Sequence, residues 1–238
     1  MNRHKFLLWD FDETLAWRPG QWTDTVMTVL RRAGFADGVD RETVRPFLNV
    51  GLPWFEPEKT RDAGRSADGW WEDAERVLAR AFLAAGTVTP AQAADLAGEV
   101  RSTYLDPSAW VVFDDVEPAL IRLSAGGWRH VILSNHVPEL PQLVDALGLA
   151  RYFDAVHTSA RIGAEKPHPE AFRRVLATLP AEAVVCMVGD NPVADVQGAE
   201  AVGLPAIRVR KGSQPADSHG ISLSNLVDRL EGGAFELM

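Results

Sequence analysis

Residues 6–14 read FLLWDFDET, four apolar side chains followed at once by Asp10 and, two positions later, by Asp12. A short apolar run without alternation is typical of a strand in a parallel sheet that is covered on both faces. The pattern recurs at residues 131–135, VILSN, and at residues 184–190, VVCMVGD, and each run ends in polar side chains. These stretches therefore predict strands of one parallel sheet.

Helical patterns lie between and after these runs. Apolar residues recur at helical spacing over residues 116–123, 140–147, 169–179 and 193–202. Weaker strand patterns occur at residues 152–156 and 206–209. This alternation of strand and helix predicts an α/β fold with a doubly wound, Rossmann-like parallel sheet.

Residues 16–111 interrupt the alternation. Apolar stripes at helical spacing end at Gly34 and Gly86, and Thr89–Pro90 has the form of a helix N-cap followed by proline at the first helical position. No strand pattern stands out within this stretch. We therefore expect an all-helical cap domain at residues 16–111, inserted into an α/β core made of residues 1–15 and 112–238.

Charge and composition disfavour several classes of protein. The 238 residues have a net charge of -9, which disfavours nucleic acid as the main partner and a polybasic contact with a membrane. The single cysteine allows no internal disulfide and favours a reducing compartment. No stretch approaches the ~20 apolar residues of a membrane span. We expect a cytoplasmic protein, whose oligomeric state the sequence leaves open.

Polar side chains gather where the predicted strands end. Because ligands of open α/β sheets bind at the carboxyl ends of the strands, one crevice is expected to hold Asp10, Asp12, Ser134, Asn135, Asp190 and Asp195. Carboxylates held this close repel one another and require a cation, a shared proton or both. Hard oxygen ligands around an open position suit Mg²⁺.

Each of these residues also has a plainer interpretation. Asp10 and Asp12 face the same side of an extended chain, where one can attack while the other handles a proton, but strand-end turns also favour Asp. Asn191 and Asp195 fit a capped helix with an acid in its first turn. Lys166 fits a solvated lysine as well as a cation that offsets the carboxylates.

Four motifs, taken in this order, resemble those of the haloacid dehalogenase-like (HAD) hydrolase superfamily. Its Asp-x-Asp-x-Thr motif resembles Asp10–Thr14, and its strand ending in Ser or Thr resembles residues 131–135. Its Lys before Pro resembles Lys166–Pro167, and its Gly-Asp-x-x-x-x-Asp motif resembles Gly189–Asp195. The insertion matches only in position and helical character, as in the subfamily that includes phosphoglycolate phosphatase. Glu13 departs from the commoner glycine of the first motif.

The resemblance implies a phosphatase that hydrolyses a small phosphorylated metabolite through an aspartyl-phosphate. Asp10 is then the nucleophile, and Asp12 protonates the leaving oxygen and later activates water. Ser134, Asn135 and Lys166 contact the phosphoryl group. Such positioning and charge neutralisation are what phosphoryl transfer requires.

The resemblance also implies a Mg²⁺ cofactor. The ion is bound by the carboxylates of Asp10 and Asp190 and by the backbone carbonyl of Asp12. Asn191 and Asp195 support this site from behind the direct ligands.

Arg18 comes four positions after the first motif and is the expected phosphate contact from the cap. A haloacid dehalogenase is an alternative on the same fold, but Asp12 argues against it because dehalogenases generally lack this second acid. A phosphomutase retains the second acid and stays open. A phospho-receiver signalling module is a remote alternative, since its acceptor Asp lies on a later strand and it has no large helical insertion. The sequence does not identify the substrate.

Overall fold

The computed structural model describes residues 4–210 and 220–232. The chain divides into two compact units. The first comprises Met1–Trp17, Pro57–Gly64 and Val112–Met238, and the second comprises Arg18–Glu56 and Arg65–Val111. Residues 57–64 thus group with the first unit although they lie within the stretch 16–111.

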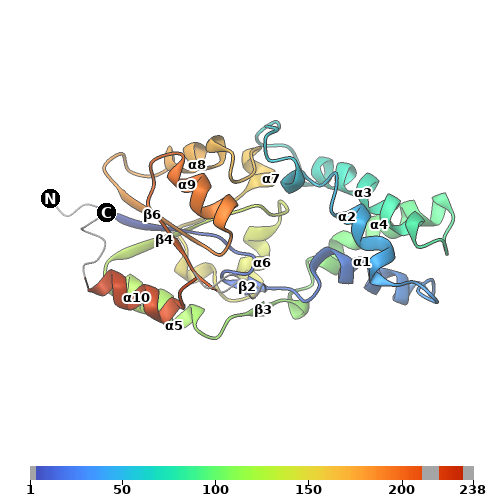
Figure 1. Cartoon of the computed structure of the whole chain (residues 1–238), viewed down its shortest axis with the longest axis horizontal. Helices are drawn as coiled ribbons and strands as arrows, with labels where there is room; N and C mark the ends of the chain where they lie inside the picture. The colour runs from blue at the N-terminus through green and yellow to red at the C-terminus, as the bar shows by residue number, and fades with distance from the viewer. Residues whose placement is uncertain (1–3, 211–219, 233–238) are drawn as a thin grey trace. The chain divides into compact units, whose positions relative to one another are not determined.

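The first unit is built on a five-stranded sheet in the order β5-β4-β1-β6-β7 (Figure 1). Its strands are β1 (Lys5–Trp9), β4 (Trp128–Ser134), β5 (Ala155–Thr158), β6 (Val184–Gly189) and β7 (Ala206–Arg208). All neighbours are parallel, and Leu8 of β1 lies opposite both Val131 of β4 and Met187 of β6. The predicted α/β fold with a parallel sheet is confirmed.

Helices cover both faces of this sheet, with α8 and α9 on one side and α5 and α10 on the other (Figure 1). The helices of this unit are α5 (Val116–Ala125), α6 (Leu140–Ala146), α7 (Ser159–Ile162), α8 (Pro169–Leu176), α9 (Gly198–Glu200) and α10 (Leu223–Glu231). Phe6 and Leu8 pack into a core cluster with Phe172 of α8. Leu7 and Trp9 alternate with them and are fully buried as well. Burial on both faces is why β1 reads as a continuous apolar run.

The structure differs from the sequence expectation at several boundaries. The strand expected at 152–156 begins only at Ala155. The helix expected at 193–202 is a π-helix over Pro192–Gln197 followed by the short α9, because the N–H of Val196 reaches back to the Asn191 carbonyl at 3.3 Å. Two-residue strands β2 (Ala16–Trp17) and β3 (Val111–Val112) form a separate sheet that was not predicted, since such short strands carry no periodicity.

The second unit is helical. Its elements are α1 (Gln21–Arg32), α2 (Arg41–Leu48), α3 (Ala67–Ala84), α4 (Pro90–Tyr104) and the short 3₁₀ turns Pro53–Phe55 and Pro107–Ala109. Thr89 caps α4 in a capping box with Gln92. Trp22 stacks on Tyr104 with ring centroids 4.2 Å apart, and Trp71 is buried beside it. Aromatic packing therefore forms much of this unit's core.

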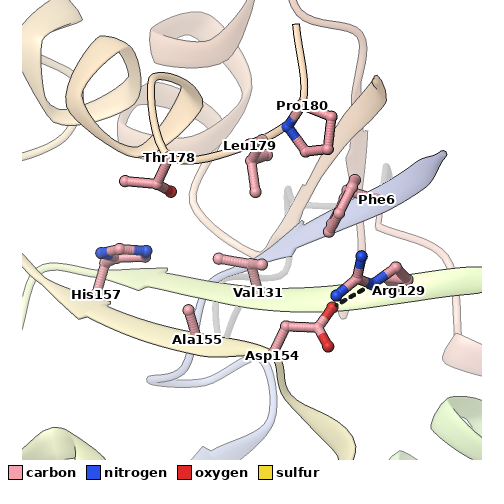
Figure 2. Close-up of a pocket in the computed structure, with 9 residues that line it drawn as sticks. All are labelled: Phe6, Arg129, Val131, Asp154, Ala155, His157, Thr178, Leu179 and Pro180. Carbon is pink, nitrogen blue, oxygen red and sulfur yellow. Dashed lines mark hydrogen bonds and ion pairs between the residues drawn. The ribbon is translucent and has the colours of Figure 1, made fainter. Parts of the chain in front are cut away.

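A hollow of about 410 Å³ is lined in part by Phe6 and Arg129, the second residues of β1 and β4. Figure 2 shows its mainly apolar lining, with the Arg129–Asp154 ion pair (2.8 Å) at one end and His157 at the other. Among the described residues, no helix has both the length and the apolar character needed to cross a membrane.

Candidate active site

The chain leaves β1 through a tight turn that carries the first acidic motif. Asp10 continues the sheet by donating its N–H to the Val188 carbonyl (2.9 Å). The N–H groups of Leu15 and Ala16 then both donate to the Phe11 carbonyl, at 2.9 and 3.1 Å. This turn puts Glu13 in the left-handed region, with φ of 58°. The conformation explains why glycine is the commoner residue at that position of the motif.

The same turn places a hydroxyl between two carboxylates. The Thr14 Oγ1 lies 3.4 Å from Oδ2 of Asp10 and 3.4 Å from Oδ1 of Asp190, although Asp190 is far away in sequence. The main chain at Asp190 is held in turn by the guanidinium of Arg208, whose Nε donates to the Asp190 carbonyl (2.8 Å). Sequence reasoning assigned no role to Thr14 or Arg208. The threonine of the first motif was the available signal for Thr14.

The loop after β6 brings in the last pair of carboxylates. Asn191 caps the following turn, because its side-chain oxygen accepts from Val193 (2.9 Å) and Ala194 (3.0 Å). Its own N–H donates to Oδ2 of Asp195 (2.9 Å). A side chain at Gly189 would meet that same Oδ2 at 2.2 Å, so only glycine lets Asp195 approach the end of the strand.

Lys166 is the cation among these carboxylates. Its Nζ lies 2.7 Å from Oδ1 of Asp10 and 2.5 Å from Oδ1 of Asp195, and only 2% of its side chain is exposed. The solvated-lysine interpretation is therefore wrong. Asn135 holds the lysine's main chain, donating to the Lys166 carbonyl (2.8 Å) and accepting from the Lys166 N–H (2.7 Å).

The negative charge of the clustered carboxylates exceeds the positive charge that Lys166 brings to them. One oxygen each of Asp10, Asp190 and Asp195 lies within 4.8 Å of the others. Burial and the neighbouring acids raise the pKa of Asp190 to about 7. Burial likewise raises the pKa of Asp195 to about 6, against the opposing effect of Lys166. Burial alone lowers the pKa of Lys166, but Asp10 and Asp195 outweigh it and raise that pKa. The site therefore favours added positive charge or added protons.

Two buried oxygens of the site are suited to a polar ligand. Oδ1 of Asp12 and Oγ of Ser134 have no hydrogen-bond partner among the described residues. Burial, followed by the Asp10 charge, raises the pKa of Asp12 well above its usual value. Because buried polar atoms are normally paired, these oxygens indicate where a polar ligand belongs. Together with the three clustered carboxylates, the donor set fits a hard divalent cation such as Mg²⁺.

Arg18 belongs to the helical unit and is engaged there. Its Nε donates to Thr25 (3.1 Å), its Nη2 donates to the Thr103 carbonyl (3.2 Å), and its guanidinium lies 5.7 Å from the Tyr104 ring centroid. Nη1 is buried and has no partner within the part of the chain that the structure describes. The structure thus brings together Asp10, Asp190, Asp195 and Lys166 within one unit, whereas the contacts of Arg18 lie in the other.

Comparison with known proteins places this geometry in context. A family model described as haloacid dehalogenase-like hydrolase matches residues 4–203. A mouse protein named "Haloacid dehalogenase-like hydrolase domain-containing protein 3" is 33% identical over 156 residues, which are 65% of this chain and 61% of that protein. The chain thus spans less than two thirds of that relative's length.

Two further proteins are similar over more of their length. The "Ribulose-1,5-bisphosphate 5-phosphatase" of Halopiger xanaduensis is 31% identical over 207 residues, covering 84% of this chain and 82% of that protein. The crystal structure of a HAD phosphatase from Thermococcus onnurineus is 25% identical, with a TM-score of 0.60 over 95% of this chain and 97% of that one.

Proposed function

The chain belongs to the haloacid dehalogenase-like hydrolase family, whose model spans residues 4–203, and from this premise we propose that it is a Mg²⁺-dependent phosphatase acting on a small phosphomonoester. The observation that carries the proposal is the contact of the Lys166 ammonium with Asp10 (2.7 Å), beside a cluster of further carboxylates. The phosphatase name of the Halopiger relative supports the same reaction class.

Asp10 is the proposed nucleophile. Its Oδ1 is engaged by Lys166 at 2.7 Å and its Oδ2 lies near the Thr14 hydroxyl at 3.4 Å, and one oxygen of this carboxylate attacks phosphorus. Attack forms the aspartyl-phosphate bond and breaks the bond to the leaving oxygen. Lys166 and the unpartnered Ser134 hydroxyl are the proposed contacts of the transferring phosphoryl oxygens. Asn135 contributes by holding the Lys166 main chain in place.

Asp12 is the proposed acid and base. Burial raises its pKa, which favours the protonated form needed to donate a proton to the leaving oxygen. The resulting carboxylate then takes a proton from the water that attacks phosphorus and releases phosphate. After this second step Asp12 is protonated again and Asp10 is free, so the cycle closes.

The proposed metal ligands are the carboxylates of Asp10 and Asp190 and the backbone carbonyl of Asp12, while Asn191 and Asp195 support them. Asn191 does so as the cap that fixes the loop, and Asp195 through its contacts with Lys166 and the Asn191 N–H. When bound, Mg²⁺ supplies positive charge that offsets the charge of the phosphoryl group and of the carboxylate cluster.

The helical unit is the proposed cap that selects the substrate. Arg18 is its candidate phosphate contact, because Nη1 of its guanidinium is buried without a partner among the described residues. A cap of this kind excludes water when it closes over a site and brings specificity residues to the substrate.

Hydrolysis of p-nitrophenyl phosphate, measured with Mg²⁺ and with EDTA, tests the proposal. We expect turnover that requires the metal and is abolished in Asp10→Asn. Metal-independent release of chloride from a 2-chloro acid, with no phosphatase activity, would show the dehalogenase alternative instead. Turnover that survives in Asp10→Asn refutes the nucleophile assignment.

A further inference from the structure

Arg210 lies just beyond β7 and makes contacts that none of the four motifs accounts for. Its Nε and Nη2 both donate to the Thr14 carbonyl, each at 3.1 Å. On its other side, Nη1 and Nη2 pair with the two carboxylate oxygens of Asp115, at 2.9 and 2.7 Å. The guanidinium also lies 4.0 Å from the centroid of the Phe113 ring. We call the Thr14–Arg210–Asp115 arrangement the Arg210 clamp.

The clamp joins segments that are distant in sequence, since Arg210 is separated from Thr14 by 196 positions and from Asp115 by 95. Thr14 precedes β2, and Asp115 follows β3. The Phe113 N–H donates to the Leu15 carbonyl (3.2 Å), so the two segments also touch directly. All of these residues belong to the α/β unit.

Two backbone conformations show that this geometry is held against local preference. Arg210 itself has φ of 61°, and Glu13, one residue before Thr14, has φ of 58°. Residues other than glycine rarely adopt the left-handed backbone region, and they do so where surrounding contacts hold them there. The Arg210 N–H donates to the Ile221 carbonyl (2.9 Å), which fixes the backbone that presents the guanidinium. The side chain of Arg210 is 16% exposed.

Thr14 links the clamp to the carboxylates. Its carbonyl is held by Arg210, while its Oγ1 lies 3.4 Å from both Asp10 and Asp190. We propose that Arg210 is a positioning residue, which holds the Thr14 main chain so that the hydroxyl sits between the two proposed metal ligands. The role deepens the proposed function and rests on its metal site. Arginine is suited to it because the planar fork makes two hydrogen bonds to the Thr14 carbonyl and two to the Asp115 carboxylate, a bidentate geometry that a lysine ammonium does not reproduce.

The test compares Arg210→Ala, Arg210→Lys, Thr14→Val and the double variant Arg210→Ala/Thr14→Val with the unchanged protein. Mn²⁺ binding, followed by electron paramagnetic resonance of the free ion, reports the site without turnover. Hydrolysis of p-nitrophenyl phosphate with Mg²⁺ reports kcat and KM. Arg122→Ala is the matched control, because Arg122 also pairs with two carboxylates, Asp228 and Glu231, on the α5–α10 surface.

We expect Arg210→Ala to weaken Mn²⁺ binding by about tenfold, in the range typical of residues that support metal ligands. Arg210→Lys should recover only part of this loss. Arg122→Ala should change Mn²⁺ affinity by less than about twofold. Because Arg210 acts through Thr14, the double variant should bind Mn²⁺ about as tightly as whichever single variant binds the ion more weakly. The kinetic loss should be larger at limiting than at saturating Mg²⁺, and it should appear in kcat rather than in KM for the phosphate ester.

The inference is overturned if the losses of the two single variants multiply in the double variant, or if Arg210→Ala binds Mn²⁺ as the unchanged protein does. If Arg210→Ala does not fold, Arg210→Lys and Asp115→Asn carry the same comparison. If the unchanged protein binds Mn²⁺ but does not hydrolyse the phosphate ester, the proposed phosphatase function is contradicted. The Mn²⁺ affinities of the variants then still decide whether Arg210 positions Thr14. Hydrolysis without any Mn²⁺ binding overturns the clamp's role toward a metal.

Discussion

Replacing Asp190 with Asn should make the metal-free protein more stable, and the gain should grow as the pH rises. Asp190 lies in the carboxylate cluster, and burial together with Asp10 and Asp195 raises its pKa from 3.8 to about 7. A raised carboxyl pKa means that the folded protein binds the proton more tightly than the unfolded chain does. The stabilisation from this proton is therefore complete below pH 3.8 and is lost as the pH rises to about 7.

The magnitude follows from the pKa difference. Raising the pKa of Asp190 from 3.8 to about 7 corresponds to about 4 kcal/mol, because a tenfold change in proton affinity is about 1.4 kcal/mol. Between pH 5 and pH 7.5 the unchanged protein should therefore lose about 3 kcal/mol that Asp190→Asn does not lose. The substitution removes the charge at position 190, and with it both the free-energy cost of burying that charge and its repulsion with Asp10.

Urea unfolding in EDTA, followed by tryptophan fluorescence at both pH values, measures the difference. Asp145→Asn, at an exposed position of α6, is the control and should shift stability equally at both pH values. Adding Mg²⁺ should stabilise the unchanged protein at pH 7.5 more than Asp190→Asn, because the ion binds the folded state through this carboxylate. The reasoning is refuted if Asp190→Asn has the same effect on the free energy of unfolding at pH 5 and pH 7.5.

Three further predictions concern other parts of the chain. Asp12→Asn should lower kcat for an alkyl phosphomonoester by about 10²- to 10⁴-fold, because the leaving oxygen loses its proton donor, and by less for p-nitrophenyl phosphate, whose leaving group needs little protonation; equal losses for both substrates contradict the acid role. Gly189→Ala should reduce both stability and phosphatase activity, since its Cβ would lie 2.2 Å from Oδ2 of Asp195, whereas Gly98→Ala, with nothing within 4 Å, should raise the melting temperature through helix propensity. Thr89→Ala should destabilise the protein by about 1 kcal/mol in urea unfolding through loss of the α4 cap, with p-nitrophenyl phosphate hydrolysis unchanged at a temperature where the variant is fully folded.

The sequence by itself determined the α/β architecture. Runs such as 6–9 and 131–133 are apolar at every position because both faces of a parallel strand are buried, and this property is visible without knowing any neighbour. The cap of α4 at Thr89 was equally predictable, because a helix N-cap depends on residues within three positions of one another. The carboxylates at strand ends followed from the rule that parallel strands present their carboxyl ends at one edge.

Only the tertiary structure decided how the site is held together. Lys166 meets Asp10 across 156 positions, and Arg210 meets Thr14 across 196. The Asn135 amide makes two hydrogen bonds to the main chain of Lys166, 31 positions away. Local patterns carry no record of such pairs, because a lysine or an arginine in a loop has the same sequence signature whether it is solvated or buried against a carboxylate. The distinction depends on desolvation and on distances of a few ångströms, which arise only when the strands are assembled side by side.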